Sequence, residues 1–120
     1  GIPVVRDPDG TVRGVEAVID KDLTAALLAR GLGCDALVIA TDVEHAVLGF
    51  GTPQEQPIGR VTTAQIRAYA ADGHFASGSM GPKVEAATRF VESGGGRAVI
   101  TSLARITDAV HGGFGTSIEN

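Results

Sequence analysis

The chain has 120 residues, 43% of them hydrophobic, and a formal net charge of −4. This length predicts that residues 1–120 form a single domain, and the acidic balance without a basic patch argues against a nucleic-acid partner. No apolar run reaches the ~18 residues that a membrane-spanning helix needs, so we expect a cytoplasmic protein with no membrane partner.

The N-terminal part predicts a hairpin-like excursion followed by a helix. Residues 6–10 (Arg-Asp-Pro-Asp-Gly) are a turn signal, and residues 11–14 lead back out of it. Asp20 or Asp22 can cap a helix over Leu23–Arg30, because a side-chain carboxylate accepts from the free amides of the first turn.

The continuous apolar run Ala36–Ala40 predicts a strand that is buried on both faces, and Arg97–Ser102, with an apolar centre and hydroxyls at its carboxyl end, predicts another buried strand. The first run continues into Thr41-Asp42-Val43, and open α/β sheets bind ligands at the carboxyl ends of their strands. Thr41 and Asp42 are therefore candidate site residues, although they can equally be turn formers. Cys34, the only cysteine, cannot form an internal disulfide, and its apolar neighbours predict a buried thiol in the core.

The rest of the chain predicts further alternation of helices and strands. We expect a short strand within Ala46–Phe50, an exposed loop over Gln54–Arg60, a helix over Ala64–Ala71 capped by Thr62 or Thr63, helices over Pro82–Ser93 and Leu103–Val110, and a last strand at Thr116–Ile118. Such alternation predicts an α/β fold with layers around a mainly parallel central sheet.

The stretch Gly78-Ser79-Met80-Gly81-Pro82-Lys83 is a flexible turn that runs directly into a helix. Pro82 suits a first helical position. Glycines let backbone amides approach a ligand closely, and the amino end of a helix favours an anion. Lys83 adds a positive charge in the first turn, where helices usually prefer a negative one. This placement predicts a phosphate site.

The chain contains only two lysines, Lys21 and Lys83, and each stands at the start of a predicted helix. Phosphoryl transfer needs positive charge and backbone donors around the moving group. Two lysines, with Asp22 to hold them, would supply this charge. The alternative is that both are ordinary surface lysines and that Asp20 and Asp22 serve only as helix caps.

Other catalytic motifs are missing from the sequence. The glycine turn lacks the spacing of a Walker loop, and no Gly-x-Gly-x-x-Gly follows a strand. His45, His74 and His111 are scattered, which favours solvated or capping roles over a metal site. No local signature of a serine or cysteine nucleophile is present.

Four blocks of the sequence together resemble carbamate kinases, within the amino-acid kinase superfamily. They are residues 14–23, Thr41-Asp42-Val43, residues 75–87 and residues 100–103, and the resemblance extends over essentially the whole chain. It implies a three-layer sandwich, present here only in part, because members of the family are two to three times longer. The chain is similar to their nucleotide-binding C-terminal half, with Gly1-Ile2-Pro3-Val4 as the tail of a glycine-rich motif.

The resemblance implies reversible phosphoryl transfer between ATP/ADP and carbamate, with Mg²⁺, in a homodimeric enzyme. Lys21 and Lys83 would contact the transferring phosphate, and Asp22 would organise them. The nucleotide would be bound by residues of the turns and strand ends: Asp20, Thr41, Asp42, Val43, Gly78, Ser79, Met80 and Gly81. The site for carbamate or carbamoyl phosphate would lie mostly outside this chain, and the protein ligands of any metal remain unknown.

Two other interpretations of the chain's function stay open. The chain could belong to another amino-acid kinase, such as an acetylglutamate or uridylate kinase, although the Asp-Lys-Asp motif favours carbamate kinase. It could also be a non-catalytic nucleotide-sensing or scaffold domain of the same fold. Because a missing half would leave sheet edges and apolar faces uncovered, we also expect self-association.

Overall fold

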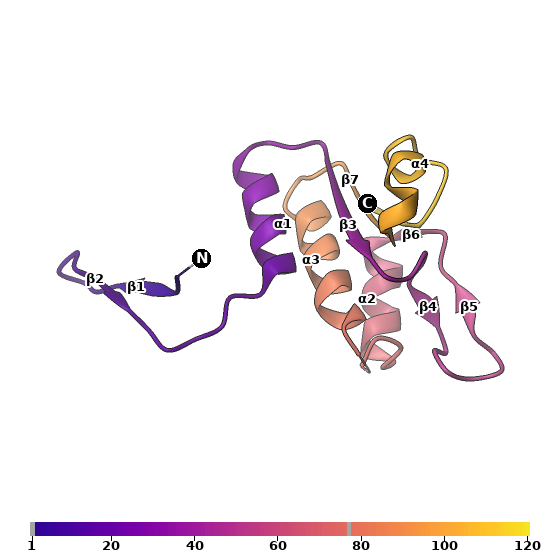
Figure 1. The fold of residues 1–120 in the computed structure, drawn as a ribbon, viewed down its shortest axis with the longest axis horizontal. Coiled ribbons are helices and arrows are strands. Elements are labelled where there is room, and N and C mark those ends of the chain that lie inside the picture. Colours follow the sequence, from indigo (N-terminus) through magenta and orange to yellow (C-terminus); the bar gives the residue numbers. More distant parts are fainter. Residues whose placement is uncertain (1, 77) are drawn as a thin grey trace.

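The computed structural model describes residues 2–76 and 78–120, so that Gly1 and Ser77 lie outside the described residues. In chain order the elements are β1 (Val4–Arg6), β2 (Val12–Gly14), α1 (Lys21–Gly31), β3 (Ala36–Thr41), β4 (Val47–Leu48), β5 (Gln56–Pro57), β6 (Arg60–Thr62), α2 (Thr63–Ala71), α3 (Met80–Glu92), β7 (Arg97–Ser102), the 3-10 helix η1 (Leu103–Arg105), α4 (Ile106–Val110) and β8 (Thr116–Glu119). The β1–β2 hairpin stands apart from a layered body that contains the other elements, which gives the molecule its extents of 54 × 29 × 27 Å (Figure 1).

A four-stranded sheet with the order β3-β7-β8-β6 forms the centre of the body. The two apolar runs of the sequence pair in parallel, with Val38 opposite Val99. β8 is antiparallel to β7 and parallel to β6. The α/β fold with a mainly parallel central sheet is thus confirmed.

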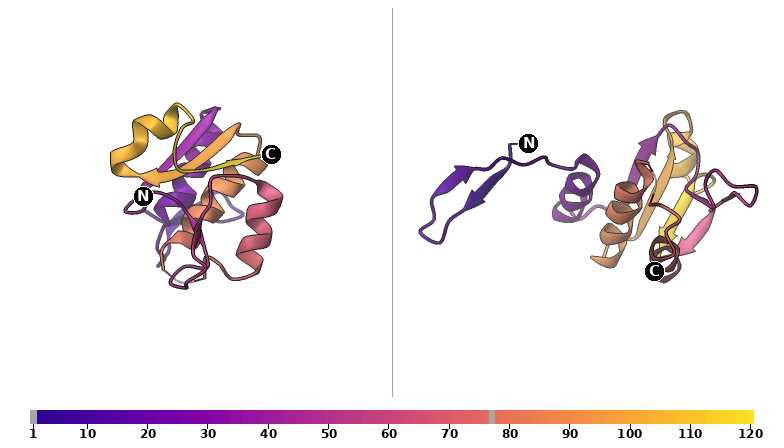
Figure 2. Two further views of the ribbon diagram at one scale, coloured as in Figure 1. Left: turned by 90° about the vertical axis from the view of Figure 1, so that its right-hand side faces the viewer. Right: turned by 90° about the horizontal axis from the view of Figure 1, so that it is seen from below.

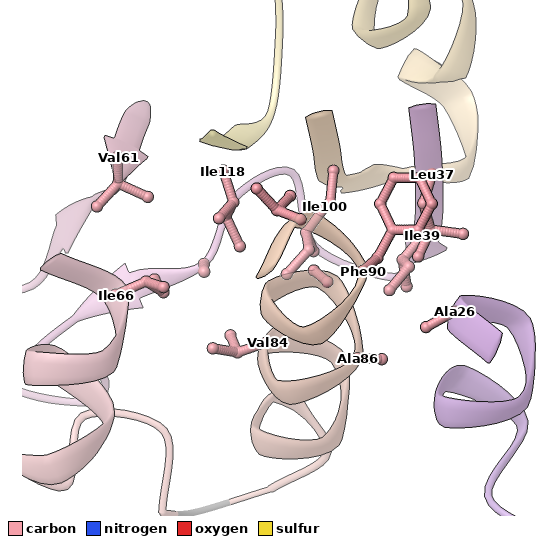
Figure 3. Close-up of a cluster of buried hydrophobic side chains, with 14 of the residues drawn as sticks. Ala26, Leu37, Ile39, Val61, Ile66, Val84, Ala86, Phe90, Ile100 and Ile118 are labelled. Carbon is pink, nitrogen blue, oxygen red and sulfur yellow. The ribbon is translucent and has the colours of Figure 1, made fainter. Parts of the chain in front are cut away.

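Helices cover both faces of the sheet. Figure 3 shows Leu37, Ile39 and Ile100 pointing from the strands towards Phe90 of α3, with α1 and α2 on either side of α3. Alternate residues of a strand face opposite sides, so Val99, which is 1% exposed, points the other way. On that side α4 contacts β3 and β7 and buries Ala109.

The predicted N-terminal excursion is confirmed as the β1–β2 hairpin, which pairs Val4 with Gly14 in antiparallel register. Its turn is closed by local bonds: the amide of Gly10 donates to the Asp7 carbonyl, and the amide of Thr11 donates to the Asp9 carboxylate. The right view of Figure 2 shows the hairpin projecting away from the helices and the sheet.

The segment predicted as an exposed loop over Gln54–Arg60 contains more order than expected. β5 pairs with β4, and Arg60 begins β6, which pairs with β8. Local sequence does not reveal these strands, because they are two or three residues long and β6 pairs with residues almost sixty positions away. Of the two predicted caps of α2, Thr62 is the one observed, and it forms a reciprocal capping box with Gln65.

The prediction that Cys34 is buried is wrong, because the cysteine is exposed. It lies in the turn between α1 and β3, where its amide donates to the Ala29 carbonyl and Gly33 has a φ of 67°. The turn lies beyond the end of α1, so apolar neighbours in sequence do not become packing neighbours in space. Within the residues that the structure describes, no helix is long and apolar enough to cross a membrane.

Candidate functional site

The amino end of α1 separates the roles of two aspartates. The Asp20 carboxylate accepts from the amide of Leu23 at 2.8 Å and is the N-cap of the helix. Asp20 thereby satisfies one of the free amides of the first turn. The carboxylate of Asp22, two residues further along the chain, interacts with side chains instead. Capping thus accounts for one of the two aspartates that flank Lys21.

The amino end of α3 has a different construction. The helix begins at Met80, two residues before the predicted start, and Pro82 therefore occupies its third position. The missing amide of proline costs nothing there, because the first four amides have no partner within a helix. Ser79, the N-cap, makes no side-chain capping bond among the described residues. The Ser79 side chain therefore does not compete with an anion for the amides of this turn.

Asp22 joins the two lysines through one carboxylate oxygen. Its Oδ2 lies 3.2 Å from Nζ of Lys83 and 3.4 Å from Nζ of Lys21. The side chain of Lys83 is 7% exposed, whereas that of Lys21 is 81% exposed. The structure therefore brings together all three predicted catalytic residues as one cluster, which carries one net positive charge.

The two helices that carry this cluster lie side by side, and both begin at the same end of the body (Figure 1). The amino end of a helix carries a partial positive charge from its aligned peptide groups. Two such ends and the net charge of the lysine cluster add up in one place. This end of the molecule is suited to a polyanion.

A cavity of about 520 Å³ opens beside the amino end of α3. Its volume is in the range of small-molecule sites. It is lined by six of the predicted nucleotide-binding residues, namely Thr41, Asp42, Val43, Gly78, Ser79 and Met80. The other two, Asp20 and Gly81, do not line it.

Sequence reasoning missed the other wall of the cavity. The β4–β5 hairpin and its flanks contribute Val47, Phe50, Glu55 and Pro57, and the histidines His45 and His74 also line the cavity. The strand predicted within Ala46–Phe50 is confirmed as β4, but the hairpin was missed because the segment of its partner β5 was predicted as a loop. Neither histidine is simply solvated, because Nδ1 of His74 accepts from the amide of Gly49 and the ring of His45 packs on that of Phe114.

The cavity and the lysine cluster have opposite charges. Asp42, Glu44 and Glu55 line the cavity, whereas the cluster lies one helical turn beyond Met80. Asp42 accepts from the Thr41 hydroxyl, and Glu55 accepts from the amide of Gly51. An elongated ligand with one anionic end would therefore place that end at the lysines and its uncharged part in the cavity.

Among the described residues, no group of three or more His, Cys, Asp or Glu side chains could hold a metal ion. Mg²⁺ that accompanies a nucleotide is bound largely by phosphate oxygens and water, with only one or two protein carboxylates. Any such ion would therefore be bound mainly by the ligand rather than by a cluster of side chains of the described residues.

Comparison with known proteins gives a consistent result. The profile of the amino acid kinase family matches residues 1–102. The chain is 49% identical to the carbamate kinase of Thermococcus kodakarensis over 98% of its own length, and 48% identical to that of Pyrococcus furiosus. It spans 37% of the length of each of these relatives.

The similarity extends to solved structures. Carbamate kinase from Giardia lamblia bound to AMP-PNP superposes with a TM-score of 0.94 and 45% identity, over 100% of this chain and 42% of that one. N-acetylglutamate synthase from Neisseria gonorrhoeae superposes with a TM-score of 0.66 at 20% identity, which shows a shared fold only.

Proposed function

The chain belongs to the amino acid kinase family, and from that premise we propose that it forms the nucleotide-binding part of a carbamate kinase. Such an enzyme transfers a phosphoryl group reversibly between ATP and carbamate, with Mg²⁺ bound to the nucleotide phosphates. Because the chain spans 37% of its curated relatives, the complete reaction would need further residues for carbamate. Similarity to carbamate kinases over 98% of the chain supports this reaction over that of other amino-acid kinases.

The lysine cluster is the observation that carries the proposal. Lys83, buried and only 3.2 Å from Asp22, is a fixed cation at the amino end of α3. In phosphoryl transfer, charge spreads over the oxygens of the moving group, and catalysis comes mainly from positioning and electrostatic stabilisation. Lys83 and Lys21 would stabilise that charge, and Asp22 would hold both ammonium groups in place before the substrate arrives.

The opposite charges of the cluster and the cavity set the direction of the nucleotide. The phosphates would lie at the lysines and at the backbone amides of Met80 and Gly81 in the first turn of α3, because both attract anions. The nucleoside would fill the 520 Å³ cavity, with Phe50 and Val47 as apolar contacts. The Giardia carbamate kinase with 45% identity was solved with AMP-PNP, an ATP analogue, and this supports nucleotide binding by the present fold.

Titration of the chain with ADP by isothermal calorimetry tests the proposal. We expect saturable binding that weakens at least tenfold in Lys83→Ala, because the variant loses a charge-assisted contact to phosphate. Arg13→Ala is the matched control, because Arg13 is a cation on the distant β1–β2 hairpin. Absence of ADP binding by the unaltered chain, or equal loss in both variants, would overturn the proposal.

A further inference from the structure

One wall of the cavity is formed by a short hairpin that has little pairing of its own. The β4–β5 hairpin, which carries Val47 and Pro57, pairs across two residue positions only. Two-stranded ribbons of this size are marginal in water unless other elements hold them. Besides the bond from the Gly49 amide to Nδ1 of His74, the position of the wall is fixed where the hairpin joins the body, at Ala46 and Ile58.

A closed ring of three hydrogen bonds lies at this junction. The amide of Ala46 donates to Oγ1 of Thr116 at 2.9 Å, and the Thr116 hydroxyl donates to the Ile58 carbonyl at 2.6 Å. The amide of Ile58 donates back to the Ala46 carbonyl at 2.8 Å. Ala46 and Thr116 are fully buried, and Ile58 is 6% exposed. A single hydroxyl thus ties both ends of the hairpin to β8.

Thr116 is itself held firmly in position. It is opposite Ile100 in the antiparallel pairing of β7 and β8. The preceding residue, Gly115, has a φ of 89°, and a Cβ atom there would lie 2.6 Å from the Ile100 carbonyl oxygen. The same segment places Phe114 against His45, with 4.9 Å between ring centroids. Residues 114–116 therefore support the cavity wall from outside, since none of them lines the cavity.

We propose that Thr116 is a positioning residue for the nucleoside part of the ligand, acting through the ring of hydrogen bonds that orients the β4–β5 hairpin. The inference rests on the proposed function, because it takes the cavity as the nucleoside site. The hydroxyl is used as acceptor and as donor at once, a pairing that valine, of the same shape, cannot make. Loss of the hydroxyl leaves a buried amide and a buried carbonyl short of a partner, and the hairpin must shift to satisfy them.

The test compares Thr116→Val with Thr116→Ser, which keeps the hydroxyl. Thr88→Val is the matched control, because Thr88 is 1% exposed and its hydroxyl bonds the Val84 carbonyl within α3, away from the cavity. Calorimetry gives the affinity of each variant for ADP and for inorganic pyrophosphate, which lacks the nucleoside. We expect Thr116→Val to weaken ADP about tenfold with pyrophosphate unchanged, and Thr116→Ser and Thr88→Val to behave as the unaltered chain.

Equal ADP affinity in Thr116→Val and the unaltered chain would overturn the inference and leave the proposed function standing. An equal loss for ADP and pyrophosphate would also overturn it, because it would indicate general loosening. If the unaltered chain binds no ADP, both fail together. If Thr116→Val does not fold, hydrogen exchange of the unaltered chain tests the inference instead. ADP should then slow exchange at the amides of Ala46 and Ile58. Slower exchange at cavity-lining residues alone would overturn the inference.

Discussion

Lys83 Nζ lies 3.2 Å from Asp22 Oδ2 at the interface of α3 and α1, and both side chains are at most 10% exposed. A buried ion pair is costly to form, because both charges lose their water. It is far more costly to break, because the remaining charge is then buried without a partner. The pair is therefore a poor way to stabilise the fold and a good way to hold a cation in place for a ligand.

We expect Asp22→Asn to lower the free energy of unfolding by about 3 kcal/mol, because the variant leaves the buried side chain of Lys83 without its carboxylate partner. Urea unfolding followed by circular dichroism measures this. Asp108→Asn is the control, because Asp108 pairs with Arg105 at the surface, and exposed pairs contribute less than about 1 kcal/mol. Adding Lys83→Met to an Asp22→Leu background should restore most of the stability, and failure to do so would contradict this account.

Stability should fall in acid because of the arginine–glutamate network between α2 and α3. Burial raises the pKa of Glu85, but hydrogen bonds from Arg89 and Arg67 outweigh it and hold this pKa below its usual value of 4.5. The hydrogen bond from Arg67 likewise lowers the pKa of Glu92. Both carboxylates bind protons less readily in the folded chain than in the unfolded one.

It follows that their contribution is complete above pH 4.5 and is lost as the pH falls through the lowered values. The melting temperature measured between pH 6 and pH 3 should decrease less steeply in Arg67→Met than in the unaltered chain. Arg13→Met, on the separate hairpin, is the control. Parallel curves for all three proteins would show that the network does not set the acid sensitivity.

The chain alone should bind ADP but should not produce ATP from carbamoyl phosphate. The chain spans 37% of its carbamate kinase relatives, and the proposed site accounts only for the nucleotide and the transferring group. A coupled assay for ATP, with a complete carbamate kinase as positive control, measures the activity. Robust turnover by the chain alone would show that it also contains the carbamate site.

Exposed apolar side chains on α1 should make the chain self-associate. Leu27 and Leu28 of α1, and Leu32 at its C-cap, are each more than 60% exposed. Beside α1, within the described residues, β3 is an edge strand that pairs with β7 alone. Contiguous apolar surface and free strand edges promote association. Sedimentation velocity should show a concentration-dependent increase in size that Leu27→Glu and Leu28→Glu together reduce, and a stable monomer at all concentrations would contradict this expectation.

The sequence was sufficient to predict the elements that have strong local signals. The segments of β3 and β7 have apolar centres of strand length. Capping residues were narrowed to two candidates for each helix, and the structure selects Asp20 for α1 and Thr62 for α2. The meeting of Lys21, Asp22 and Lys83 is a tertiary contact between residues 61 positions apart, and it was expected from family resemblance and charge placement.

What the sequence did not predict depends on contacts between distant segments. The strands β5 and β6 are too short to give a periodic signal, and they form because other strands offer them hydrogen bonds. The role of Thr116 is hidden for the same reason, because its partner Ala46 is 70 residues away. The exposure of Cys34 follows from the direction of a turn, which apolar composition does not specify.

The placement of Lys83 on α3 couples the stability of the hydrophobic core to the position of a ligand-binding cation. The same helix contributes Val84, Ala87, Phe90 and Val91, which are at most 3% exposed, to the hydrophobic interior. A substitution that repacks this interior would therefore also displace the ammonium group. A change of stability made through these four positions would therefore also change the affinity for a phosphate, which couples thermal adaptation of the chain to ligand binding.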